Sequence, residues 1–165
     1  MGERKIRIHA ESMIEASAQV IYEIIADYHS AHPEIVPKPY FQGIRVESGG
    51  VGAGTVISVT IRVLGRTSVL RQRVSEPEPG RALVESNLDG TLETTFIVTP
   101  VSGAKDRKAN VSITTVMKTH PGIRGIFEQR LIPRILHPAY QKELKLLQVV
   151  ARKRTTAADP ARPAG

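Results

Sequence analysis

Apolar and polar residues alternate along most of this chain, as they do in strands that bury one face of a sheet. Residues Lys5 to Ile14 show the pattern first, with Ile6, Ile8, Ala10, Ser12 and Ile14 on one side. From Phe41 onward, turn signals rich in glycine or proline recur about every ten residues. They separate six more alternating stretches, so the pattern predicts a sheet of seven antiparallel strands.

Two stretches have helical spacing instead. Ser17 can cap a helix that runs to about Asp27, because the apolar residues between them recur three and four positions apart. Residues Gly122 to about Lys153 carry a longer amphipathic pattern that contains two prolines. Proline lacks an amide hydrogen and its ring clashes with the preceding turn. We therefore expect a long C-terminal helix against the sheet, with a kink between Ile132 and Pro138.

The alternation also predicts which side chains face the interior of the sheet. We expect these to be Ile57, Val59, Ile61 and Val63 on one strand, Leu70, Gln72 and Val74 on the next, Leu92, Thr94, Phe96 and Val98 on a third, and Val111, Ile113, Thr115 and Met117 on the last. The predicted inner face is therefore aliphatic, with isolated polar groups.

The strand that contains Val84 lies between the second and third of these strands. The turns on either side of it decide which of its side chains face the interior. Pairing across the turn in EPEPG would bring Val84 and Ser86 inward and leave Glu85 outside, opposite Arg73. A three-residue loop, Leu88 to Gly90, then keeps Leu92, Thr94 and Phe96 of the following strand on the inner face. This register places no carboxylate on the inner face.

Composition narrows the class of protein. The 165 residues fit one domain, and the absence of cysteine excludes disulfides, thiolate metal sites and thiol catalysis. No stretch is apolar enough for a membrane span or a secretory signal, so we expect a cytoplasmic protein.

We assign residues 1 to 154 to a single domain. Residues 155 to 165, a basic tail rich in alanine and proline, are expected to be disordered.

The net charge of +7 indicates attraction to anions. On the predicted C-terminal helix, a basic face would comprise Arg124, Arg130, Arg134, Lys142, Lys145 and Arg152 to Arg154. An interaction module for an anionic membrane surface or for nucleic acid is therefore one hypothesis. No nucleic-acid recognition motif accompanies the charge, so nucleic acid is the less favoured partner.

The stretch DYHSAHPEIVPKPYF, from Asp27 to Phe41, concentrates histidines, carboxylates and prolines. His29 and His32 have the spacing of some zinc-binding pairs, but Pro33 stops a helix there and no signature such as HExxH supplies a third ligand. We therefore predict no metal site. The prolines fix an irregular path between apolar anchors, which is typical of a lid.

Familiar catalytic signatures are missing from the sequence. GGVGAG at 49–54 lacks the lysine of a phosphate-binding loop and precedes a strand, so we interpret it as a hairpin loop. No cofactor is predicted. A cyclase would need interior groups that shuttle protons, and His120, Arg130, His137 and Tyr140 are candidates near the helix. Catalytic residues are left unassigned.

The stretch MIEASAQVIYEIIADYHSAHPEIVP resembles the opening of the polyketide cyclase/dehydrase and lipid-transport group of the START-related (SRPBCC, Bet v 1-like) superfamily, and EPEPGRALVES is also similar to it. The resemblance covers about residues 5 to 152. It implies an α+β helix-grip fold, in which a curved seven-stranded antiparallel sheet wraps round the C-terminal helix, with one or two short helices after the first strand. It also implies a cavity for a small hydrophobic molecule between sheet and helix.

From this resemblance we expect binding or transport of a lipid, polyketide, isoprenoid or aromatic molecule, with a carrier favoured over an enzyme. A polyketide aromatase/cyclase acting in the cavity and the basic interaction module remain alternatives, and the oligomeric state is open. The inner-face pattern and the resemblance together nominate as ligand-binding residues Tyr28, His29, Ile35, Val59, Ile61, Gln72, Ser86, Thr94, Phe96, Thr115, Phe127, Arg130, Leu131 and Arg134.

Overall fold

The computed structural model describes residues 4–63, 65–103 and 106–158. The elements follow the chain as β1 (Lys5–Ile14), α1 (Ala18–Ala26), α2 (His32–Ile35), β2 (Phe41–Ser48), β3 (Val56–Val63), β4 (Arg66–Glu78), β5 (Ala82–Asn87), β6 (Leu92–Pro100), β7 (Ala109–Lys118) and α3 (Ile123–Ala158). The strands form one antiparallel sheet in the order β1-β7-β6-β5-β4-β3-β2.

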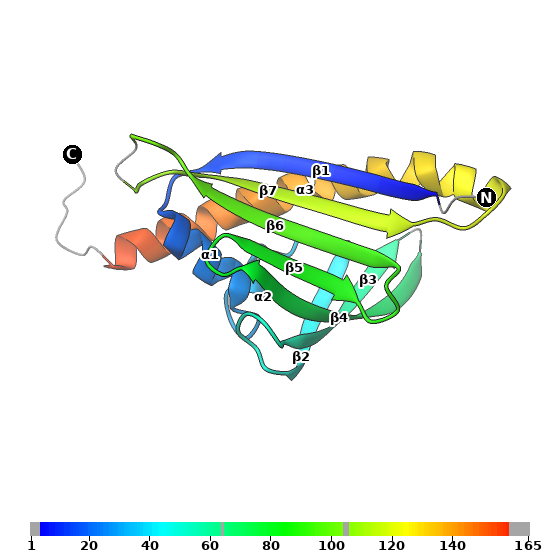
Figure 1. Ribbon diagram of the computed structural model, residues 1–165, viewed down its shortest axis with the longest axis horizontal. Helices are drawn as coiled ribbons and strands as arrows, with labels where there is room; N and C mark the ends of the chain where they lie inside the picture. The colour runs from blue at the N-terminus through cyan, green and yellow to red at the C-terminus, as the bar shows by residue number, and fades with distance from the viewer. Residues whose placement is uncertain (1–3, 64, 104–105, 159–165) are drawn as a thin grey trace.

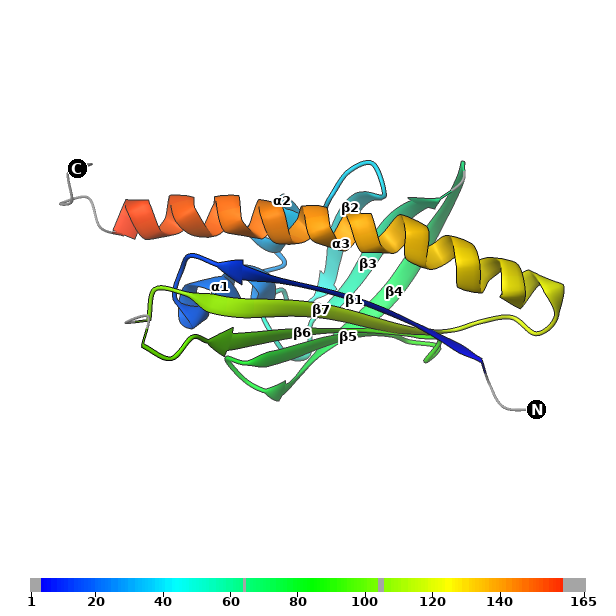
Figure 2. The same cartoon turned by 90° about the horizontal axis from the view of Figure 1, so that it is seen from above.

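The sheet is strongly curved, and α3 runs along its concave face. Figure 1 shows β2 and β3 crossing at a steep angle to β1, β6 and β7, while Figure 2 shows α3 lying above the sheet with α1 and α2 near its C-terminal half. The helix-grip fold predicted from the sequence, with two short helices after β1, is confirmed. No helix among the described residues combines the length and apolar character needed to cross a bilayer.

The core lies where the C-terminal half of α3 meets β1 and α1. Ser17 caps α1 as predicted, because its Oγ accepts a hydrogen bond from the Val20 amide at 3.2 Å. On α3, burial is concentrated in one stretch, at Ala139, Tyr140, Glu143, Leu144, Leu147, Val150 and Ala151. The turns before this stretch are mostly exposed or half-buried, so α3 makes a continuous core contact over only part of its length.

α3 remains one helix through Pro133 and Pro138. Figure 2 shows its yellow N-terminal turns inclined to the orange remainder, so the prolines bend the helix without ending it. At the other end the helix continues to Ala158, so residues 155–158 are helical and the predicted start of the disordered tail was wrong. In this last part of the helix, the hydroxyls of Thr155 and Thr156 each donate to a carbonyl oxygen four residues earlier at 2.9 Å. Residues 159–165 lie outside the described residues.

The predicted register of β5 was wrong by one residue. β4 and β5 pair Val74 with Glu85 and Arg73 with Ser86, and a β-bulge between Ser75 and Glu78 shifts the hairpin. Because strand side chains alternate, a slip of one residue turns every side chain to the opposite face. Glu85 therefore faces the interior, whereas Ser86 faces outward and its hydroxyl donates to Glu93 at 3.3 Å.

The loop after β5 compensates for this shift. Asn87 is buried and the loop spans four residues, 88–91, instead of the three that we predicted. The extra residue turns β6 back to its predicted orientation. Its Thr94, Phe96 and Val98 are therefore buried, as expected. The inner faces predicted for β3, β4, β6 and β7 are thus correct, and only β5 is inverted.

The contact of α3 with the core should dominate stability. Leu147 is 1% exposed, so Leu147→Ala removes buried apolar volume and should lower the free energy of unfolding by about 2–5 kcal/mol. Val149, two residues away, is 48% exposed, so Val149→Ala should change the free energy of unfolding by less than about 0.5 kcal/mol. Urea denaturation of both variants measures the difference. Equal losses would contradict the assignment of the core to this face of α3.

Candidate functional site

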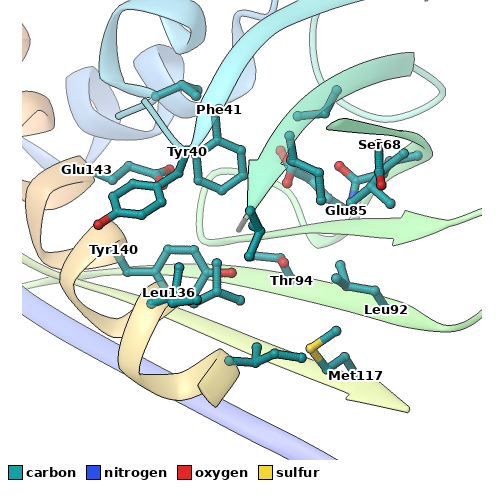
Figure 3. Close-up of a pocket in the computed structure, with 18 of the residues that line it drawn as sticks. Tyr40, Phe41, Ser68, Glu85, Leu92, Thr94, Met117, Leu136, Tyr140 and Glu143 are labelled. Carbon is teal, nitrogen blue, oxygen red and sulfur yellow. The ribbon is translucent and has the colours of Figure 1, made fainter. Parts of the chain in front are cut away.

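A cavity lies between the N-terminal half of α3 and the concave face of the sheet (Figure 3). Its wall is mostly aliphatic and aromatic, as in pockets that bury an apolar ligand. The lining residues are His32, Val36, Tyr40, Phe41, Ile44, Val59, Ile61, Val63, Ser68, Leu70, Gln72, Glu85, Leu92, Thr94, Phe96, Met117, Arg124, Ile132, Ile135, Leu136, Tyr140 and Glu143.

Five of the nominated residues are in this wall: Val59, Ile61, Gln72, Thr94 and Phe96. All five come from the strands whose inner faces were predicted correctly. Their presence follows from strand alternation alone, because one face of a strand must point at the helix.

The nominated residues on α3 lie outside the lining. Arg130 and Arg134 are exposed, Phe127 is 65% exposed, and Leu131 is half-buried. The lining face carries Arg124, Ile132, Ile135, Leu136, Tyr140 and Glu143 instead. Phe127 and Leu131 were nominated from apolar residues that recur at steps of four, at Ile123, Phe127, Leu131 and Ile135. Each step overshoots a full turn by about 40°, so such a stripe winds round the helix, and of these four residues Ile135 alone lines the cavity.

The remaining nominated residues lie behind or beyond the cavity. Tyr28 and Ile35 are almost fully buried in the core, and Thr115 is buried beneath the wall. Ser86 faces outward, as described above. His29 is exposed, and its Nε2 lies 3.1 Å from the carbonyl oxygen of Gly49.

His29 and His32 point in different directions, so they do not act as a pair. His32 is 3% exposed and its ring stacks on Tyr28, with centroids 4.5 Å apart. Its Nδ1 lies 2.6 Å from the carbonyl oxygen of Ile25, which can only accept, so Nδ1 carries a proton and donates. Within 4–63, 65–103 and 106–158, no three histidine, aspartate or glutamate residues gather as metal ligands.

The glycine loop at 49–54 docks against the start of the predicted lid. The Tyr28 amide donates to the Gly50 carbonyl oxygen at 2.9 Å, and the Gly52 amide donates to Ala26 at 3.0 Å. A Cβ on Gly50, whose φ is +134°, would lie 1.8 Å from Nε2 of His29. The glycines therefore allow a close approach of two backbones, in agreement with the hairpin-loop interpretation.

Two carboxyl groups enter the cavity, which the sequence analysis did not anticipate. Glu85 accepts a hydrogen bond from the Tyr28 hydroxyl at 2.6 Å, and its Oε1 lies 3.6 Å from Nε2 of His32. Glu143 projects from α3 into the same cavity (Figure 3). A signal for Glu143 exists in the sequence, because it lies three residues after Tyr140 and four before Leu147, in the middle of the buried stripe.

Glu143 is in an unusual environment for a carboxyl group. It is 5% exposed and, among the residues that the structure describes, it has neither a hydrogen bond nor an ion pair. Burial raises its pKa well above the ordinary value of 4.5, and the nearby Glu85 raises that pKa further. The protonated form is therefore favoured.

A chain of hydroxyl groups lies beside the two acids. The Tyr140 hydroxyl is 2.5 Å from Oγ1 of Thr115, which is 2.8 Å from Oγ1 of Thr94. Burial raises the pKa of Tyr140. Of the four residues considered for a cyclase, only Tyr140 lines the cavity; His120, Arg130 and His137 are exposed, and Nδ1 of His120 lies 2.9 Å from Glu128.

Comparison with known proteins identifies relatives of this fold. The sequence model of a family described as polyketide cyclase/dehydrase and lipid transport matches residues 5–152. No curated protein sequence matches the chain. The solution structure of KanY protein has 22% identity and a TM-score of 0.76, covering 92% of this chain and 99% of that one.

Two further structures extend the likeness. Zhui aromatase/cyclase from Streptomyces sp. R1128 has 14% identity and a TM-score of 0.75, covering 94% of this chain and 98% of that one. A START superfamily protein from Mycobacterium smegmatis has 14% identity and a TM-score of 0.67, covering 89% and 97%. At such identities the likeness concerns the fold.

The raised pKa of Glu143 should appear in the pH dependence of stability. Below the ordinary pKa of 4.5 the carboxyl is protonated in both states. As pH rises above it, the unfolded chain ionises first, so the free energy of unfolding falls until the raised pKa of the folded protein is reached. In Glu143→Gln, this fall in the free energy of unfolding should be absent. The exposed Glu34 supplies the control, since Glu34→Gln should follow the wild-type curve, and urea denaturation across this pH range distinguishes the two.

Proposed function

Because this chain belongs to the polyketide cyclase/dehydrase and lipid transport family, we propose that it binds a small hydrophobic or amphipathic molecule in the cavity between the sheet and α3. The candidates are a lipid, a polyketide, an isoprenoid or an aromatic compound. The observation that carries this proposal is the composition of the wall, in which apolar side chains surround a few inward polar groups.

Carriage or transport of the molecule is favoured over its conversion. Three of the four candidates for proton transfer lie outside the cavity, and the hydroxyls of Tyr140, Thr115 and Thr94 are already engaged with one another. A binding protein needs only an apolar wall and a polar anchor, and both features are present.

An aromatase/cyclase remains the alternative, and one observation favours it. Glu143 and Tyr140 line the cavity with shifted pKa values, and titratable groups of this kind are common in active sites. Conversion of a bound polyketide, lost in Glu143→Gln, would support the alternative over a carrier.

An anionic membrane surface is a second proposed partner. The first turns of α3 expose Ile123, Ile126 and Phe127, of which Ile123 is 87% exposed. Arg130 and Arg134 follow on the same helix and are also exposed. Apolar and cationic side chains in this combination match the acyl and headgroup regions of an anionic bilayer. Because Arg124 lines the cavity, this end of α3 is next to the binding site.

Binding in the cavity can be tested by native mass spectrometry of protein purified without detergent, followed by solvent extraction of any bound molecule. A stoichiometric apolar adduct is expected. Ile61→Trp should abolish it, because the indole fills the cavity, whereas Thr60→Trp places the same ring on the opposite face of β3 and should retain it. An adduct that persists in Ile61→Trp, or loss of the adduct in both variants, would argue against this cavity.

Membrane binding can be tested by sedimentation with vesicles of phosphatidylglycerol and phosphatidylcholine. Phe127→Ser should weaken binding about tenfold, because the free energy of burying the ring is lost. Val149→Ser, on the same helix at 48% exposure, should bind like the wild type. Binding should also fall as salt rises. Equal binding to vesicles of phosphatidylcholine alone would exclude the role of the arginines.

A further inference from the structure

Glu143 is a buried polar group that the protein itself leaves without a partner. It is 5% exposed, lines the cavity, and makes no hydrogen bond or ion pair with any described residue. A buried carboxyl group normally has a hydrogen-bond partner. Among the described residues, the side-chain atoms sealed from solvent without a partner are Asn87 Oδ1 and Gln148 Nε2, so the Glu143 oxygens are instead open to the cavity, where a bound molecule can supply the partner.

The surroundings of Glu143 decide which form of the group meets the ligand. The titratable or charged groups that line the cavity with it are Glu85 from β5, His32 from α2, Tyr40 before β2, and Tyr140 and Arg124 from α3. Glu85 accepts a hydrogen bond from Tyr28, so one of its oxygens is already engaged. Burial, and then the proximity of Glu85, raise the pKa of Glu143, so Glu143 presents a carboxylic acid with one O–H to donate.

We propose that Glu143 is the polar anchor of this cavity and that its protonated carboxyl donates a hydrogen bond to a carbonyl oxygen of an uncharged ligand. This inference rests on the proposed function and specifies its ligand class. The ligand is an apolar molecule with a keto group at the end that lies between α3 and β5.

Anionic ligands fit this end of the cavity poorly. A carboxylate or phosphate head would meet Glu85 and Glu143 together. Arg124 is the one lysine or arginine among the described residues that line the cavity. Lys142, adjacent to Glu143, is turned away and its Nζ donates to the Lys38 carbonyl oxygen at 2.8 Å. Arg124 lies near the start of α3, where its side chain is 69% exposed and contacts Glu128.

A cationic ligand is also less suited than a ketone. An ammonium group has three N–H donors, all of which need acceptors once it is buried. Glu85 Oε1 is already engaged by Tyr28, and an ammonium would also require Glu143 to give up its proton. A carbonyl oxygen needs one donor, and Glu143 supplies one.

Matched probes can separate these ligand classes. Acetylnaphthalene, ethylnaphthalene and naphthylethylamine share the naphthalene ring system. The first carries a ketone, the second has no polar group, and the third carries an ammonium group. Isothermal titration calorimetry gives their dissociation constants. The ketone should bind about tenfold more tightly than the hydrocarbon, as expected for a hydrogen bond formed in an apolar cavity. Its affinity should fall as pH rises through the raised pKa of Glu143, because the carboxyl group then loses the proton that it donates.

Two substitutions test the identity of the donor. Glu143→Gln keeps an N–H donor of similar shape, so the ketone should still bind within about threefold, but its affinity should no longer depend on pH. Glu143→Leu removes the donor and should reduce binding about tenfold. Gln72→Leu removes another buried polar group from the same wall and should keep the pH dependence. If the pH dependence persists in Glu143→Gln, another group is responsible for it and this inference is wrong.

Each contrary outcome has a distinct meaning. If the amine binds most tightly, gains affinity as pH rises and is lost in Glu143→Gln, the anchor is an anionic site for a cation and this inference is wrong. If the hydrocarbon binds as tightly as the ketone in every variant, the cavity binds apolar molecules but Glu143 is not the anchor. If none of the three probes binds, the proposed binding function fails and this inference fails with it.

Discussion

The mismatch between a long, stiff helix and a curved sheet is the constraint on which the rest of this structure depends. α3 has 36 residues, which corresponds to about 54 Å, and a helix of this length cannot follow a strongly twisted surface. It makes a dry contact with β1 and α1 over its C-terminal half, from Ala139 to Ala151. Beyond that contact α3 and the sheet diverge (Figure 2). The cavity lies between them (Figure 3).

The polar groups of the site lie at the boundary between the dry contact and the cavity. Tyr140 and Glu143 belong to the same buried stripe as Leu144 and Leu147, but their outer atoms reach the cavity wall. On the opposite side, Glu85 is fixed by Tyr28, whose ring stacks on His32. Packing thus holds the two acids in place, and both line the cavity.

The sequence predicted the elements and most inner faces, because alternation and helical spacing are local signals. Alternation placed Val59, Ile61 and Thr94 on the inner face of the sheet, and the family resemblance supplied the expectation of a cavity there. The errors came from effects that alternation does not contain. A bulge beyond Ser75 inverted β5 and brought Glu85 inside. On α3, apolar residues four positions apart wind round the helix, which left Phe127 and Leu131 off the lining face. Glu143 was missed because a charged residue within an apolar stripe was not counted as part of it.

The uneven burial of α3 also gives the helix two different local stabilities. Its C-terminal half is tied to the global core, so it can open only when the whole domain unfolds. The N-terminal half, from Ile123 to about His137, rests on few buried side chains and can separate from the sheet in a partial opening of much lower free energy. The turns of α3 that line the cavity therefore belong largely to its less stable half, and amide hydrogen exchange there can change without any change in the melting temperature of the domain.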